Sequence, residues 1–170
     1  MKIYNNAAEV IGNTPLIRFS SYAKKANISA EILAKAEYLN PAGSAKDRVG
    51  YEMLLSAMAD GRIDKNSVII EPTSGNTGIG IASVAAQMGL KVIITMPETM
   101  SIERRKLLAA YGAELVLTDG KKGMPGAIEK ANELAKEIEG SFIPAQFDNP
   151  ANPDAHVSTA NEILRDVGKV

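Results

Sequence analysis

Short apolar runs alternate along the chain with longer segments in which apolar residues recur at helical spacing. This alternation is typical of βα units that build a mostly parallel sheet. Strands are predicted at residues 31–36, 68–71, 92–96, 114–117 and 141–144. Three of these runs are too apolar to have a solvated face, so helices are expected on both sides of the sheet. The pattern therefore predicts a three-layer α/β/α fold.

Helices are predicted at residues 46–60, 76–88, 101–111, 124–138 and 153–166. The first four are followed by glycines that suit helix ends, Gly61, Gly89, Gly112 and Gly140. Residues 118–126, rich in glycine and lysine, are predicted to form a surface loop. Residues 167–170 resemble a glycine stop and the first residue of another strand. We therefore expect the sequence to break off where another unit begins, as in a fragment or a truncated gene product.

Composition narrows the class of protein. The chain has 170 residues, of which 45% are hydrophobic, and a formal net charge of -1, which suits one domain with its own core. Its 19 basic and 20 acidic residues are spread without long runs of one sign, so neither a nucleic-acid nor a membrane partner is expected. Residues 1–6 contain no signal-peptide apolar region, and we expect a cytoplasmic protein. With no cysteine and one histidine, a zinc site is not expected.

The stretch from Glu71 to Gly80 reads EPTSGNTGIG and lies between a predicted strand and a predicted helix. Free backbone N–H groups and the positive end of a helix dipole meet at such a junction, so a carboxylate or phosphate is expected to bind there. The alternative is that these side chains only cap the helix. One cap needs one such residue, and the surplus of polar side chains favours a binding loop. The loop matches neither the dinucleotide fingerprint nor the P-loop.

Lys46 opens the first long predicted helix, directly after a turn formed by residues 40–44. Most lysines are simply solvated. Here the turn holds the lysine in place, and a second loop that suits an anion is expected nearby. This combination has the form of a Schiff-base site for a carbonyl cofactor. In contrast, the charged run at residues 103–106 is predicted to be a solvated helix face.

Five stretches closely resemble, in the same order, the cysteine synthases or O-acetylserine sulfhydrylases. They are residues 11–16, 40–48, 71–80, 96–106 and 146–153. These are pyridoxal-phosphate enzymes of the tryptophan-synthase-β fold type, or fold type II. The resemblance implies pyridoxal phosphate as cofactor and a β-replacement that converts O-acetyl-L-serine and sulfide to L-cysteine and acetate. It also implies a homodimer, and possible docking of a serine acetyltransferase C-terminal tail.

The same resemblance assigns roles to individual residues. Lys46 matches the lysine that binds the cofactor covalently and then removes the substrate α-proton. Asn76 matches the asparagine that binds the 3′-oxygen of the cofactor. The residues implied in substrate binding are Thr73, Ser74, Gly75, Asn76, Thr77 and Gln146. No metal is implied.

The chain also departs from the family pattern. Family members are longer, and their second half carries a loop for the cofactor phosphate and a serine facing the pyridine nitrogen, neither of which is found here. Family architecture implies that residues 1–45 belong partly to the larger domain, that residues 46–145 form the smaller α/β domain, and that residues 146–170 start the larger one. We therefore expect this chain to bind pyridoxal phosphate weakly or not at all.

Two other functions remain open. The chain also resembles cystathionine β-synthases, which differ in using homocysteine instead of sulfide as the acceptor. The third possibility is a catalytically silent domain that survives as a fragment or binds a partner protein. The run from Met96 to Lys106 favours cysteine synthase over its cystathionine-forming relative.

Overall fold

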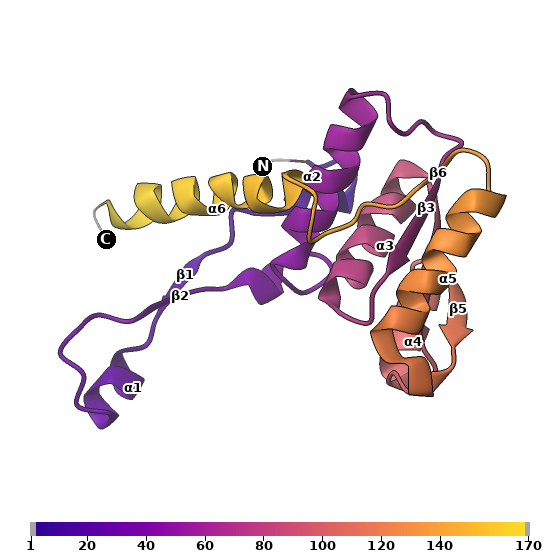
Figure 1. The fold of residues 1–170 in the computed structure, drawn as a ribbon. Coiled ribbons are helices and arrows are strands. Elements are labelled where there is room, and N and C mark those ends of the chain that lie inside the picture. Colours follow the sequence, from indigo (N-terminus) through magenta and orange to yellow (C-terminus); the bar gives the residue numbers. More distant parts are fainter. Residues whose placement is uncertain (1–2, 169–170) are drawn as a thin grey trace.

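The fold consists of an α/β part and an arm, residues 16–35, that projects from it (Figure 1). The computed structural model describes residues 3–168, and the strand start expected at residues 169–170 lies outside this range. The α-helices are α1 (Ser20–Lys25), α2 (Lys46–Ala59), α3 (Asn76–Met88), α4 (Ile102–Ala110), α5 (Gly123–Glu137) and α6 (Ala151–Val167). The strands are β1 (Leu16–Arg18), β2 (Leu33–Lys35), β3 (Val68–Pro72), β4 (Lys91–Pro97), β5 (Glu114–Thr118) and β6 (Ser141–Phe142). Short 3-10 helices are η1 (Ala7–Val10), η2 (Glu37–Leu39) and η3 (Gly120–Lys122).

The main sheet is parallel, with the strand order β5-β4-β3-β6. Successive residues of β3 and β4 face opposite sides, as strand geometry requires. Ile69 and Ile94 pack in the larger core cluster, which α2 and α3 also form. Ile70 and Ile93 pack with Ala131 of α5 on the other side. Helices therefore cover both faces, and the predicted three-layer α/β fold is confirmed.

Each predicted helix is present, with ends shifted by no more than a few residues, but two predictions need correction. The strand expected at residues 31–36 is shorter, and it pairs antiparallel with β1 in a separate two-stranded sheet. β1 was not predicted, because its three residues are too few to show a period. The prediction of a loop at residues 118–126 is wrong from residue 120 onward. The 3-10 helix η3 begins there, and α5 follows it directly. The division into residues 1–45, 46–145 and 146–170 stays a prediction.

Two glycines allow α2 and α3 to pack closely. A Cβ atom on Gly80 would lie 2.8 Å from the carbonyl carbon of Lys46, and one on Gly50 would lie 2.8 Å from Ile81 N. Real Cβ atoms do not approach backbone so closely. The absence of side chains at these two positions therefore sets the distance between the helices, and it places the first residue of α2 against α3.

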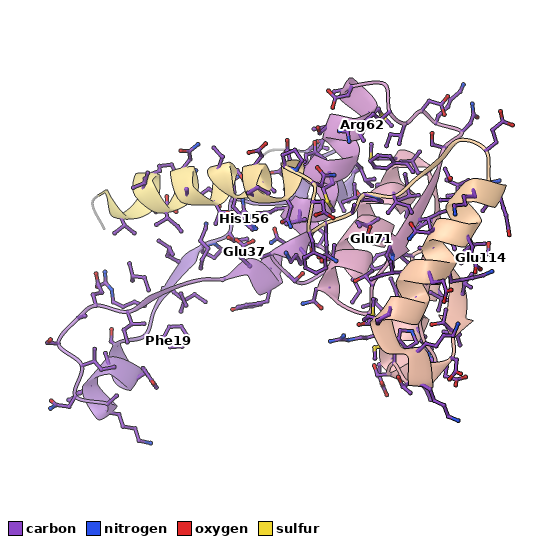
Figure 2. All side chains as sticks on the ribbon, viewed as in Figure 1. Phe19, Glu37, Arg62, Glu71, Glu114 and His156 are labelled. Carbon is purple, nitrogen blue, oxygen red and sulfur yellow. The ribbon has the colours of Figure 1, made fainter. Side chains whose placement is uncertain are left out.

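A buried ionic cluster joins α2 to the base of the arm and to α6. The guanidinium group of Arg48 donates to both carboxylate oxygens of Glu37 and of Glu162, at 2.8 Å in each case. Lys35 completes the cluster by donating to Glu162 at 2.6 Å. The side chain of Arg48 is only 3% exposed. Figure 2 shows Glu37 close to the start of α2, below α6. The cluster therefore fixes segments that are distant in sequence around the helix that begins with Lys46.

The ionic cluster around Arg48 is expected to make the folded chain less stable in acid. Hydrogen bonds from Arg48 lower the pKa of Glu162 from 4.5 to about 2, against the effect of burial. Burial raises the pKa of Glu37, but hydrogen bonds from Arg48, Thr14 and Asn40 outweigh it and give a pKa of about 2. Both carboxylates therefore stabilise the fold above about pH 4.5, and this contribution is lost as the pH falls through 2.

We expect the free energy of unfolding, measured by urea titration, to fall steeply between pH 4.5 and pH 2. The Glu162→Gln variant removes one of the titrating groups and is expected to show a shallower fall from a lower starting stability. The Glu129→Gln variant is the matched control, because Glu129 forms an exposed ion pair with Lys122. An unchanged slope in Glu162→Gln would contradict this account of acid sensitivity.

Candidate functional site

A cleft of about 730 Å³ opens at the carboxyl ends of β3 and β6. This is the edge of a parallel sheet at which ligands commonly bind. The residues that line the cleft are Glu71, Pro72, Thr73, Ser74, Gly75, Thr77, Met124, Ile128, Asn132, Ile143, Ala145, Gln146, Phe147 and Asp148. Phe147 is 92% exposed, so an aromatic ring stands at the rim. The cleft combines an apolar wall from α5 with a polar wall from the loop before α3.

The polar wall is built by the loop that enters α3. Gly75 is the N-cap residue of α3, and no side chain makes a capping hydrogen bond there. The hydroxyl of Thr73 instead accepts the N–H of Gly75 at 3.2 Å, which shapes the turn. The capping alternative is therefore wrong. The first N–H groups of α3 and its positive dipole end remain available to an anion in the cleft.

Three polar side chains form a chain of hydrogen bonds along this wall. The hydroxyl of Thr77 donates to Gln146 Oε1 at 2.6 Å. Gln146 Nε2 in turn donates to Glu71 Oε1 at 3.5 Å. The other oxygen of Glu71 accepts the N–H of Ala145 at 3.2 Å. Ala145 has a φ of 51°, so this carboxylate supports a left-handed turn that carries Gln146 toward α3.

Lys46 lies next to α3 but outside the cleft lining. The turn before it is held by Asn40, whose Nδ2 donates to the carbonyl oxygen of Ser44 at 3.0 Å, and by Asp47, which accepts the N–H of Ala42 at 2.6 Å. The Lys46 side chain is half-buried. Among residues 3–168, its amine has no hydrogen-bond or ion-pair partner.

The structure brings five of the seven predicted site residues together in the cleft. They are Thr73, Ser74, Gly75, Thr77 and Gln146. Lys46 and Asn76 do not line it, but they begin the neighbouring helices α2 and α3. The Lys46 backbone contacts α3 at Gly80, one turn after the exposed Asn76. The predicted residues are thus arranged around the ends of two packed helices.

Sequence reasoning missed two residues of this region. Glu71 is 1% exposed, and Figure 2 shows it in the middle of the α/β part. A carboxylate that ends an apolar strand was the available signal. Arg104 of α4 lies in the run predicted to be a solvated face, yet its Nη1 donates to the carbonyl oxygen of Ser74 at 2.5 Å. No local pattern indicates that contact, because the two residues meet only through the packing of α4.

Two kinds of feature are not found in the part of the chain that the structure describes. Residues 3–168 contain no group of three acidic, histidine or cysteine side chains placed to hold a metal ion. Over the same range, no helix has the length and apolar character needed to cross a bilayer.

Known proteins match the chain over nearly its whole length. It is 58% identical over 164 residues to a cysteine synthase from Flavobacterium sp., and 52% identical over 171 residues to a probable cysteine synthase from Bacillus subtilis. These alignments cover 96% and 100% of this chain, but 52% and 54% of the relatives. The chain therefore spans about half the length of the curated relatives it matches.

Solved structures agree with the sequence matches. A cysteine synthase from Entamoeba histolytica superposes with a TM-score of 0.92 at 47% identity, over 98% of this chain and 50% of that one. An O-acetylserine dependent cystathionine beta-synthase from Helicobacter pylori gives 0.91 at 41% identity, over 99% and 55%. Residues 7–170 match the family described as pyridoxal-phosphate dependent enzyme. The chain belongs to this family of pyridoxal-phosphate dependent enzymes.

Proposed function

We propose that this chain carries the catalytic lysine and the substrate-carboxylate loop of a cysteine synthase. The reaction is the replacement of acetate in O-acetyl-L-serine by sulfide, which gives L-cysteine. The observation that carries the proposal is the packing of two helix starts at Gly80. One bears Lys46, and the other bears the anion-binding loop. The similarity to cysteine synthases supports the same reaction.

The residues at these helix starts fit pyridoxal phosphate. Lys46 is a half-buried residue, and its amine is unpaired within residues 3–168, as a group that bonds covalently to an aldehyde needs to be. Asn76 is exposed at the start of α3, where its amide can donate to a cofactor oxygen. We propose that Lys46 holds the cofactor covalently and that Asn76 orients it. When bound, the cofactor supplies an electron sink for the carbanion formed at the substrate Cα.

The chain's own residues would orient the substrate and move its proton. The free N–H groups at the start of α3, with Thr73, Ser74, Thr77 and Gln146, bind the substrate carboxylate. This contact aims the Cα–H bond toward Lys46. The amine of Lys46, as general base, accepts that proton on Nζ. The apolar wall of α5 excludes water from one side of the cleft.

Reductive trapping tests the role of Lys46. We expect borohydride to fix added pyridoxal phosphate on the Lys46 peptide, located by mass spectrometry, and the absorbance spectrum to show how much binds. The Lys46→Ala variant is expected to lose this label, whereas Lys65→Ala, which changes an exposed lysine, keeps it. Labelling spread over several lysines in the wild-type chain would contradict the assignment. A near-stoichiometric band would contradict the expectation of weak binding.

A second candidate activity is cystathionine formation, with homocysteine as the acceptor. The similarity to the Helicobacter pylori cystathionine beta-synthase supports this second candidate. Its TM-score of 0.91 is close to the 0.92 of the Entamoeba histolytica cysteine synthase. The two activities share every residue named above and differ only in the acceptor. Product analysis with sulfide and with homocysteine distinguishes them, and turnover with homocysteine alone would reverse our choice.

The proposal extends to location and partners. We propose a cytoplasmic homodimer that binds the C-terminal tail of a serine acetyltransferase in the cleft. Exposed apolar side chains on the arm, Ile17, Phe19 and Tyr22, favour association, and Figure 2 shows Phe19 far from the α/β part. Light scattering tests the dimer, and cell fractionation tests the cytoplasmic location.

Binding of a peptide that ends in isoleucine tests the docking of the acetyltransferase tail. No binding at high peptide concentration would contradict the proposal that this tail is a partner.

A further inference from the structure

The hydrogen bonds that link Glu71, Gln146 and Thr77 have a defined direction. Thr77 donates its only hydroxyl proton to Gln146 Oε1, and Gln146 Nε2 donates to Glu71. An ionised carboxylate only accepts hydrogen bonds, so it requires the NH₂ side of the Gln146 amide to face it. The Oε1 side must then face Thr77. The charge on Glu71 therefore fixes the direction in which the Thr77 hydroxyl donates.

This direction conflicts with the binding of a carboxylate in the cleft. A bound carboxylate can accept the free N–H groups at the start of α3, but it cannot accept the Thr77 proton, which is already donated to Gln146. Thr77 is 4% exposed, so little solvent is available to its hydroxyl as an alternative hydrogen-bond partner. Glu71 is 1% exposed and lines the same cleft, and a second negative charge beside it would be repelled at short range. An ionised Glu71 therefore weakens anion binding in the cleft, because it adds like charge and removes the Thr77 donor.

We propose that Glu71 is a positioning residue that takes up one proton from solvent when a carboxylate binds in the cleft, and that this proton reverses the hydrogen bonds through Gln146 to Thr77. Protonated Glu71 donates to Gln146 Oε1. The amide turns over, and its Nε2 donates to Thr77 Oγ1. The Thr77 hydroxyl is then free to donate to the bound carboxylate. This inference rests on the proposed function, in which the cleft binds the carboxylate of an amino-acid substrate.

The surroundings of Glu71 favour such a proton uptake. Burial raises its pKa from 4.5 to about 7, against the lowering effect of the hydrogen bonds from Ala145 and Gln146. Its partner in β4 is Ile94, and α3 and α5 present Thr77, Met124, Ile128 and Asn132 to the cleft, none of which is charged. Asp148 is the other ionisable residue in the lining. An arriving anion adds like charge and raises the Glu71 pKa further.

Propionate is a suitable probe, because it presents a carboxylate and has no amine that titrates. The experiment follows propionate binding to the chain by NMR from pH 5.5 to 8.5, using the Gln146 side-chain NH₂ signals and the ¹³C signal of the Glu71 carboxyl. We expect the Kd to be constant at low pH and to weaken about tenfold per pH unit above 7. The titration midpoint of Glu71 is expected to rise when propionate is present.

Two variants separate the proposal from a general effect of pH. The Glu71→Gln side chain always has a donor for Gln146 Oε1, so this variant should bind propionate with a Kd that does not change with pH. In Asp148→Asn the pH dependence should persist. A Kd in the wild-type chain that is constant up to pH 8.5 would overturn the proposal. So would an unmoved Glu71 midpoint, or no propionate binding at any pH.

The Glu71 ¹³C titration needs no variant, so a folding defect in Glu71→Gln would leave the test intact. This experiment and the trapping of pyridoxal phosphate on Lys46 can fail separately. Loss of the pH dependence with normal trapping would overturn only the role of Glu71. Normal proton uptake without trapping would overturn only the proposed function of the lysine.

Discussion

Replacing Arg48 with alanine is expected to lower the free energy of unfolding by about 3–5 kcal/mol. The substitution leaves the buried Glu162 and the partly buried Glu37 without the guanidinium that hydrogen-bonds to both of them. Lys35 pairs with Glu162 but reaches no oxygen of Glu37 in the hydrogen bonds of the structure. Glu37 would then have no cation beside it, and an unpaired carboxylate is strongly unfavourable away from water.

Urea unfolding at pH 7 measures this loss, and Arg18→Ala is the matched control. Arg18 forms an ion pair with Glu31, but its side chain is 66% exposed. Exposed ion pairs contribute about 0–1 kcal/mol, so the control should unfold nearly as the wild type does. If Arg48→Ala lost no more stability than Arg18→Ala, the cluster would not hold α6 and the arm to α2.

Replacing Gly80 with alanine is expected to lower the free energy of unfolding by about 1–3 kcal/mol, and to weaken trapping of pyridoxal phosphate on Lys46. The added methyl group would meet the backbone of Lys46 and Asp47, which cannot rotate away as a side chain can. The start of α2 must therefore move, and Lys46 moves with it. The two effects are linked because one contact both packs the helices and places the lysine.

Gly75→Ala provides the comparison for stability. A Cβ atom at Gly75 meets no atom within 4 Å, and the φ of -114° is one that alanine adopts. This variant should therefore unfold at nearly the wild-type urea concentration. Equal stability of Gly80→Ala and the wild type, together with normal labelling of Lys46, would show that the close approach of the helices does not position the lysine.

Most of the fold was predictable because its signals are local. Helix α3 begins and ends where the sequence indicates, since Gly89 adopts the left-handed conformation that terminates it. The apolar runs of β3 and β4 predicted strands buried on both faces, and both faces are covered. The loop before α3 was predicted from polar residues and glycines at a strand–helix junction, and its residues Thr73, Ser74 and Gly75 line the cleft.

The arm and the connections within the cleft were not predictable in this way. β1 pairs with β2 across a stretch that contains α1, and no period in three residues indicates a partner. Gln146 meets Thr77 across 69 positions of sequence. Such contacts depend on the path of the chain through space, whereas propensity and periodicity describe only neighbouring residues.

The sequence by itself determined the order of the helices and strands from α2 onward, the loop before α3 and the lysine at the start of α2. Only the tertiary structure decided that Arg48 lies between Glu37 and Glu162, and that Glu71 faces Gln146. The reason is physical. Backbone preferences act over a few residues, but a buried charge is stable only where distant segments bring a partner to it. The polar groups that position this site are therefore set by packing.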